Sequence, residues 1–115
     1  MHIEILDNKR IELLKKLSTL PIIDDFILGG GTAVSLLLGL RESFDFDFFS
    51  YQHFNIDQLE EILKNNFNDL VVINKFVPKS TLDVLINGIK VSFLEYSYKE
   101  IDEFIKLKEF NNLKL

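Results

Sequence analysis

The stretch FILGGGTAVSLLLGLRESFDFDFF, residues 26–49, decides the predicted fold of this 115-residue chain. Its apolar start, residues 26–28, stops at three consecutive glycines, and residues 32–38 that follow are apolar nearly all round. Gly39 suits the end of a helix, because glycine readily takes the left-handed conformation found there. This order predicts a strand, a glycine turn and a buried helix.

The second half of the stretch alternates phenylalanine with polar residues, which predicts a strand over residues 44–49. Asp45 and Asp47 stand two positions apart and project from one face, while the alternating phenylalanine rings are expected to be buried on the other. A solvated outer face is one explanation of the two aspartates. A shared divalent cation is the other, because neighbouring like charges are unfavourable in a strand without a compensating cation.

The glycines at residues 29–31 also allow two interpretations. They form a tight turn, or they form a phosphate site, because backbone N–H groups and the positive end of a helix converge where no side chain blocks approach. Followed by Asp45 and Asp47, they match what a magnesium–nucleotide site requires, in which amides hold phosphate and carboxylates hold metal.

The remaining sequence predicts two helices and a three-stranded meander. Asp7 caps a helix over residues 8–18, and Asn55 begins a second helix. Strands are expected over residues 70–77, 82–86 and 89–96, with Asn87-Gly88 as the turn of the last hairpin. The predicted fold class is therefore α/β (α+β), a mixed sheet of about four to five strands with flanking helices.

Composition limits the classes of function. With 47% hydrophobic residues the chain is expected to form a single domain over residues 1–115, and the lack of cysteine excludes a thiolate nucleophile. The net charge of −5 argues against broad affinity for nucleic acid. No apolar run approaches the roughly 20 residues of a membrane span, so we expect a cytoplasmic protein with no membrane partner. His2 and His53 lack ligand-like spacing and are expected to be exposed.

The motifs Gly30-Gly31-Thr32-Ala33 and, over residues 41–49, RESFDFDFF resemble the AbiEii/AbiGii toxin branch of the DNA-polymerase-β-like nucleotidyltransferase superfamily. The resemblance covers roughly residues 26–96 and implies a minimal nucleotidyltransferase fold. It implies Mg²⁺-dependent transfer of NMP from an NTP to an acceptor hydroxyl, with RNA among the acceptors. It also implies a toxin–antitoxin or phage abortive-infection context and a cognate antitoxin as a partner. The family usually continues into a helical region, so we expect either a minimal, truncated or degenerate member of the family or helices that a partner supplies.

The resemblance also implies roles for individual residues. Asp45 and Asp47 would be catalytic and bind Mg²⁺. Nucleotide binding would involve the following residues of the two motifs: Gly30, Gly31, Thr32, Arg41 and Ser43. For Arg41 a structural ion pair with Glu42 or an aspartate is an equal alternative.

One departure from the superfamily pattern leaves the activity open. The third catalytic carboxylate is expected on a later strand, at the position of Ser92 in Ile89-Lys90-Val91-Ser92, and a hydroxyl is a poor substitute. The hairpin register places Asp83 opposite Ser92, so Asp83 either supplies the missing carboxylate or simply faces solvent. Ser92 and Lys90, on the same face, either meet the nucleotide or are solvated. The alternative to an enzyme is a weak or inactive nucleotide-binding or partner-binding module.

Overall fold

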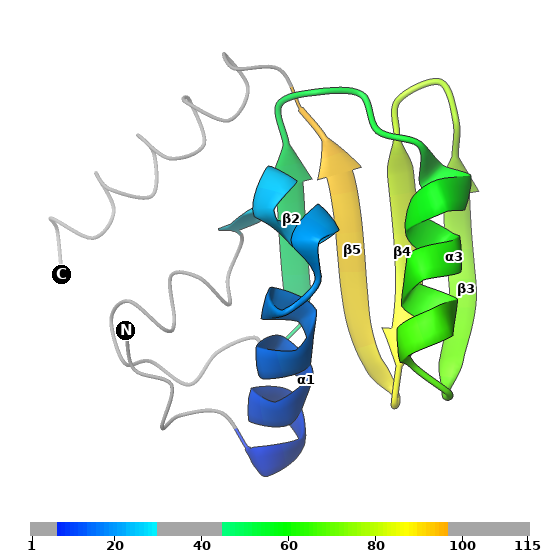
Figure 1. Ribbon diagram of the computed structural model, residues 1–115. Coiled ribbons are helices and arrows are strands. Elements are labelled where there is room, and N and C mark those ends of the chain that lie inside the picture. The colour runs from blue at the N-terminus through cyan, green and yellow to red at the C-terminus, as the bar shows by residue number, and fades with distance from the viewer. Residues whose placement is uncertain (1–6, 30–44, 97–115) are drawn as a thin grey trace, which may run out of the picture.

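One mixed sheet organises the computed structural model, which describes residues 7–29 and 45–96. The sheet has five strands in the order β1-β2-β5-β4-β3, and β2 and β5 run parallel while every other neighbouring pair is antiparallel (Figure 1). The strand bounds are β1 Ile27–Gly29, β2 Phe46–Ser50, β3 Leu70–Phe76, β4 Thr81–Ile86 and β5 Ile89–Glu95. The predicted mixed sheet with flanking helices is confirmed.

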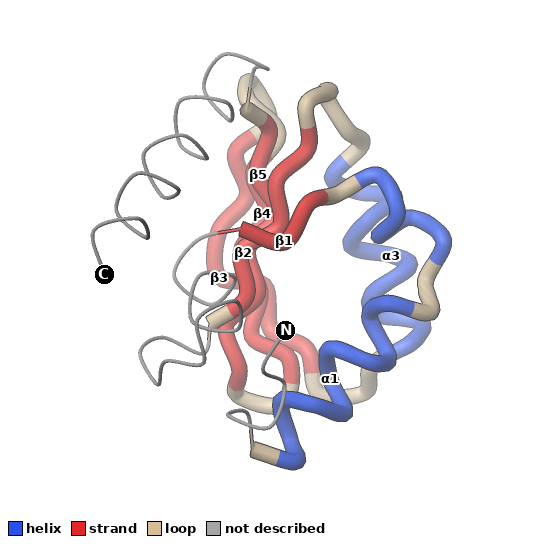
Figure 2. Tube along the Cα trace, turned by 90° about the vertical axis from the view of Figure 1, so that its left-hand side faces the viewer, coloured by secondary structure: helices blue, strands red, loops and turns tan. Residues whose placement is uncertain are grey.

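The helices lie on one face of this sheet, as the side view in Figure 2 shows. They are α1 Asn8–Ser18, the short 3-10 helix η2 Pro21–Asp25 and α3 Ile56–Asn66. Both predicted caps are present: Asp7 accepts a hydrogen bond from the Arg10 N–H at 2.9 Å, and Asn55 accepts one from the Gln58 N–H at 3.0 Å. Within residues 7–29 and 45–96, no helix is both long and apolar enough to span a membrane.

The hydrophobic core fills the space between the helices and the sheet. Phe93 on β5 lies near its centre, stacked on Phe48 at 5.4 Å between ring centroids and in edge contact with Phe26 at 5.3 Å. Phe46 and Phe48 are buried, as the alternating pattern predicts. The largest fully buried side chains are Phe46, Phe93, Leu17, Leu59, Leu63, Leu82, Ile86, Ile89, Val84 and Val91.

The hairpin between β4 and β5 has the predicted register. Asn87 and Gly88 both have positive φ, 52° and 78°, the left-handed pair that a two-residue turn of this type needs. Ile86 therefore pairs with Ile89, and Asp83 pairs with Ser92.

A β-bulge interrupts β3, an edge strand, at Ile73. Val72 pairs with Val84 and Asn74 pairs with Asp83, so Ile73 is an extra residue without a partner on β4. Beyond the bulge Lys75 points to the helix side, where it forms ion pairs with Asp57 and Glu60 of α3. The bulge thus decides which side chains of β3 face the helices.

Candidate active site

A row of small and polar residues crosses the sheet on the face opposite the helices, which we call the outer face. Asp47 on β2 pairs with Gly29 on β1 and, on its other side, with Ser92 on β5. Ser92 pairs with Asp83 on β4, and Asp83 pairs with Asn74 on β3. Residues paired across neighbouring strands point to the same face. We call this set the transverse row.

The transverse row places Asp47 and Asp83 on either side of Ser92. Asp47 and Asp83 are partly buried and Ser92 is buried, with 4% of its surface exposed. Asp83 thus lies on the strand next to Ser92, and Ser92 occupies the position at which the resemblance described above predicts a third carboxylate. The register that brings Asp83 to this face is the one expected from the Asn87-Gly88 turn.

The charged groups around Asp47 shift its pKa in opposite directions. Burial raises the pKa of Asp47 above its usual value of 3.8, and the like charges of Asp45 and Asp83 raise it further. The Lys90 ammonium lowers this pKa and only partly offsets the other effects. Asp45 lies directly before β2 and is exposed. Bound positive charge would favour the ionised form of Asp47 and relieve the repulsion.

The carboxylates fit Mg²⁺ as an incomplete ligand set. Mg²⁺ usually takes one or two carboxylates and completes its octahedron with water and substrate phosphate oxygens. Asp45 and Asp47 would supply such a pair. In residues 7–29 and 45–96, no group of three or more Asp, Glu or His residues is arranged to hold one ion. A cation here would therefore need oxygen ligands from a substrate or from solvent.

Several predicted residues lie outside the part of the chain that the structure describes. They are the nucleotide-binding candidates Gly30, Gly31, Thr32, Arg41 and Ser43, together with the predicted helix at residues 32–38 and the ring of Phe44. Gly29, the first glycine of the triplet, is the last residue of β1 and pairs with Asp47. The end of β1 therefore places the first glycine of the triplet beside Asp47 on β2.

Sequence comparison matches most of the chain to a known protein family. Residues 12–105 match the family described as nucleotidyl transferase AbiEii toxin, type IV TA system. The chain belongs to the AbiEii family. A relative of this AbiEii chain is an uncharacterized protein of Aquifex aeolicus (strain VF5), 37% identical over 94 residues, or 81% of this chain. The chain spans 45% of that relative's length. The activity named in the description of this family is nucleotidyl transfer.

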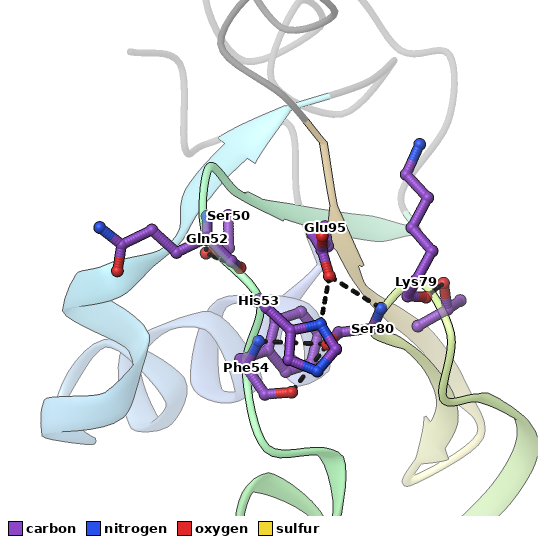
Figure 3. Close-up of polar contacts among 8 residues, drawn as sticks. Ser50, Gln52, His53, Phe54, Lys79, Ser80 and Glu95 are labelled. Carbon is purple, nitrogen blue, oxygen red and sulfur yellow. Dashed lines mark hydrogen bonds and ion pairs between the residues drawn. The ribbon is translucent and has the colours of Figure 1, made fainter.

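A second polar cluster in the AbiEii chain lies where β2 and β5 end and β4 begins (Figure 3). His53 Nδ1 lies 2.7 Å from Glu95 Oε1 and 2.9 Å from Ser80 Oγ. The Ser80 hydroxyl donates to the Phe54 carbonyl at 2.7 Å, and its backbone N–H donates to Glu95 Oε1 at 3.0 Å. The hydrogen bond from His53 is the largest cause that lowers the pKa of Glu95.

This cluster is not a nucleophilic triad, although it contains serine, histidine and a carboxylate. A triad uses one ring nitrogen for the nucleophile and the other for the carboxylate, whereas here both partners meet Nδ1 of His53. Ser80 is also fully buried, so its oxygen has no access to a substrate. We assign the cluster a structural role, in which it joins the loop after β2 to β5 and to the turn before β4.

Sequence reasoning missed this cluster. The prediction that His53 is exposed is confirmed, with 61% of its side chain accessible. Its contact with Glu95 spans 42 residues of sequence, and no spacing rule connects the two positions. The contact depends on the parallel pairing of β2 and β5, which brings the ends of both strands together.

Proposed function

We propose that this chain is a Mg²⁺-dependent nucleotidyltransferase that transfers NMP from an NTP to a hydroxyl of RNA. The supporting observation is the pair Asp45 and Asp47, with Asp47 on the outer face of β2, in a member of a nucleotidyl transferase toxin family. The family description supports a toxin–antitoxin setting with a cognate antitoxin. The proposed site of action is the cytoplasm.

The proposed reaction assigns each aspartate a task. The acceptor oxygen forms a bond to the α-phosphorus of the NTP, the bond from that phosphorus to the pyrophosphate oxygen breaks, and pyrophosphate leaves. Asp45 and Asp47 would hold the metal, and Asp83 would accept the proton of the attacking hydroxyl. The chemistry that a bound Mg²⁺ supplies is neutralisation of charge on the phosphate oxygens. Lys90 would meet a phosphate from the same face.

Label transfer tests this proposal directly. Purified protein is incubated with each α-³²P-labelled NTP, Mg²⁺ and total RNA, and labelled RNA is measured. We expect transfer with at least one NTP, lost on chelation of Mg²⁺ and in the Asp45→Asn/Asp47→Asn double variant. Transfer that survives in a folded double variant would refute the assignment of these carboxylates.

Ligand stabilisation separates binding from chemistry. Mg²⁺ with the preferred NTP should raise Tm, because a ligand at a hundredfold excess over its Kd stabilises the native state by about 2.7 kcal/mol. The double variant should show no such shift. An equal shift in the variant would place the nucleotide elsewhere on the protein.

Ser92 supports a second candidate function. A neutral hydroxyl lies directly beside Asp47 where the superfamily pattern has a carboxylate, which favours a nucleotide-binding module with little or no transfer. Such a module would show the Tm shift without label transfer. Ser92→Asp should then create transfer activity, and no gain in a folded, nucleotide-binding variant would count against loss of this one carboxylate as the reason.

A further inference from the structure

Asp83 is held by a neighbour that the sequence pattern does not reveal. The side-chain amide of Asn74 on β3 donates a hydrogen bond to Asp83 Oδ2 at 3.2 Å. Both residues belong to the transverse row, so this exposed contact reaches the carboxylate from the side away from Ser92 and Asp47.

The bulge at Ile73 places Asn74 where it can form this hydrogen bond. Val72 packs against the core from the helix side. With strict alternation Ile73 would face outward and Asn74 would face the helices. The extra residue reverses the alternation, so that Asn74 pairs with Asp83 on the outer face and Lys75 reaches α3. Bulges commonly re-aim a side chain next to a functional site.

The chemistry of the donor also matters. An amide is neutral, so Asn74 contacts Asp83 through a hydrogen bond without placing a formal charge beside it. The hydrogen bond from Asn74 uses Oδ2 of Asp83. A carboxylate has two oxygens, so Oδ1 of Asp83 can accept a proton while Oδ2 accepts the hydrogen bond from Asn74.

We propose that Asn74, presented by the bulge, is a positioning residue that orients Asp83 to accept the proton of the attacking hydroxyl. This inference rests on the proposed nucleotidyl transfer. In that step the hydroxyl proton moves to Asp83 as the oxygen bonds to phosphorus and pyrophosphate departs. Asp83 thereby takes over, from the adjacent strand, the proton transfer that Ser92 cannot perform.

Variants of Asn74 provide the test, assayed with the labelled NTP and RNA described above. Asn74→Asp has the same shape but replaces the donor by a like charge, so kcat should fall by about tenfold or more, approaching the roughly hundredfold loss expected for Asp83→Ala. Asn74→Gln retains an amide and should recover part of kcat. KM for the NTP should stay unchanged, because the proposed phosphate and metal ligands are untouched.

Val71→Thr is the matched control, since Val71 is exposed on the same strand before the bulge. It should transfer label as the wild type does. A readout independent of catalysis is the NMR signal of the Asn74 side-chain amide, which should shift when Asp83→Ala removes its acceptor. An unmoved signal would show that the contact is absent in solution and would overturn the inference.

The outcomes separate this inference from the proposed function. If wild type transfers label and Asp47→Asn abolishes transfer, while Asn74→Asp and Asp83→Ala retain full kcat, only the positioning role is refuted. If folded wild type transfers no label with any NTP, the proposed function fails and the positioning role fails with it. A fall in kcat for Asn74→Asp, partly restored in Asn74→Gln, supports both.

Discussion

At the scale of single residues, Asp47 is held in an unfavourable electrostatic environment. Burial and the neighbouring charges of Asp45 and Asp83 raise its pKa above the usual 3.8, and Lys90 offsets only part of this. The folded state therefore binds the Asp47 proton more tightly than the unfolded state does. A group of this kind lowers stability at pH values where it is ionised.

Asp47→Asn should therefore stabilise the free protein, by less than about 1 kcal/mol because the site is partly solvated. In EDTA the variant should exceed wild type in free energy of unfolding at pH 7. The difference should shrink as pH falls through the raised pKa and vanish below about 3.8, where both states are protonated. Urea denaturation across pH measures this, with the exposed Asp69→Asn as control. A difference that grows toward acid pH would contradict the assigned sign.

At the scale of elements, the pairing of β1 with β2 requires glycine, the residue without a side chain, at position 29. Gly29 lies on the outer face under the ring of Phe49, and a Cβ at this position would overlap that ring. Phe49 in turn makes an edge contact with Tyr96, with 5.3 Å between ring centroids. The first glycine of the triplet is thus a packing residue of the sheet.

Gly29→Ala should destabilise the fold by about 1–3 kcal/mol, because the Phe49 ring must move and well-packed sites resist added volume. The double variant Gly29→Ala/Phe49→Ala should lose less than the sum of the two single variants, because the second change removes the overlap. Chemical denaturation of all four proteins measures the coupling. Strict additivity would show that the ring is not the obstacle.

Local signals predicted most of the elements. Asp7 and Asn55 each stand before an apolar pattern of helical period, so side-chain capping marked both helix starts correctly. The turn at Asn87-Gly88 fixed the pairing of Asp83 with Ser92, because a two-residue turn leaves one register. This pairing is the part of the candidate site that sequence reasoning placed correctly.

Other features have no local signal. Val71, Val72 and Ile73 are all apolar, so no alternation shows which side chains face outward or that Ile73 is an extra residue. The position of Asn74 beside Asp83 therefore escaped prediction. Predicted strand ends differ by one or two residues, as for the strand expected at residues 44–49 and found at Phe46–Ser50, with residue 44 outside the described part.

At the scale of the whole molecule, the sheet consists of two parts. β3, β4 and β5 form an antiparallel meander joined by short turns, and β1 pairs with β2. The parts meet where β2 runs parallel to β5. The transverse row crosses this junction, with Asp47 on one side and Ser92, Asp83 and Asn74 on the other.

The parallel junction has a consequence for folding order. The strands of the meander pair through contacts that are near in sequence. Phe46 and Val91, by contrast, are separated along the chain by α3, β3 and β4. Closing such a long loop slows the pairing of β2 with β5. Pulsed hydrogen exchange during refolding should protect the amides of β4 and β5 before those of β2. Earlier protection of β2 would refute this order. The two halves of the transverse row would then come together after the meander has formed. A folding intermediate would carry Asp83, the proposed proton acceptor, without Asp47, a proposed metal ligand, beside it.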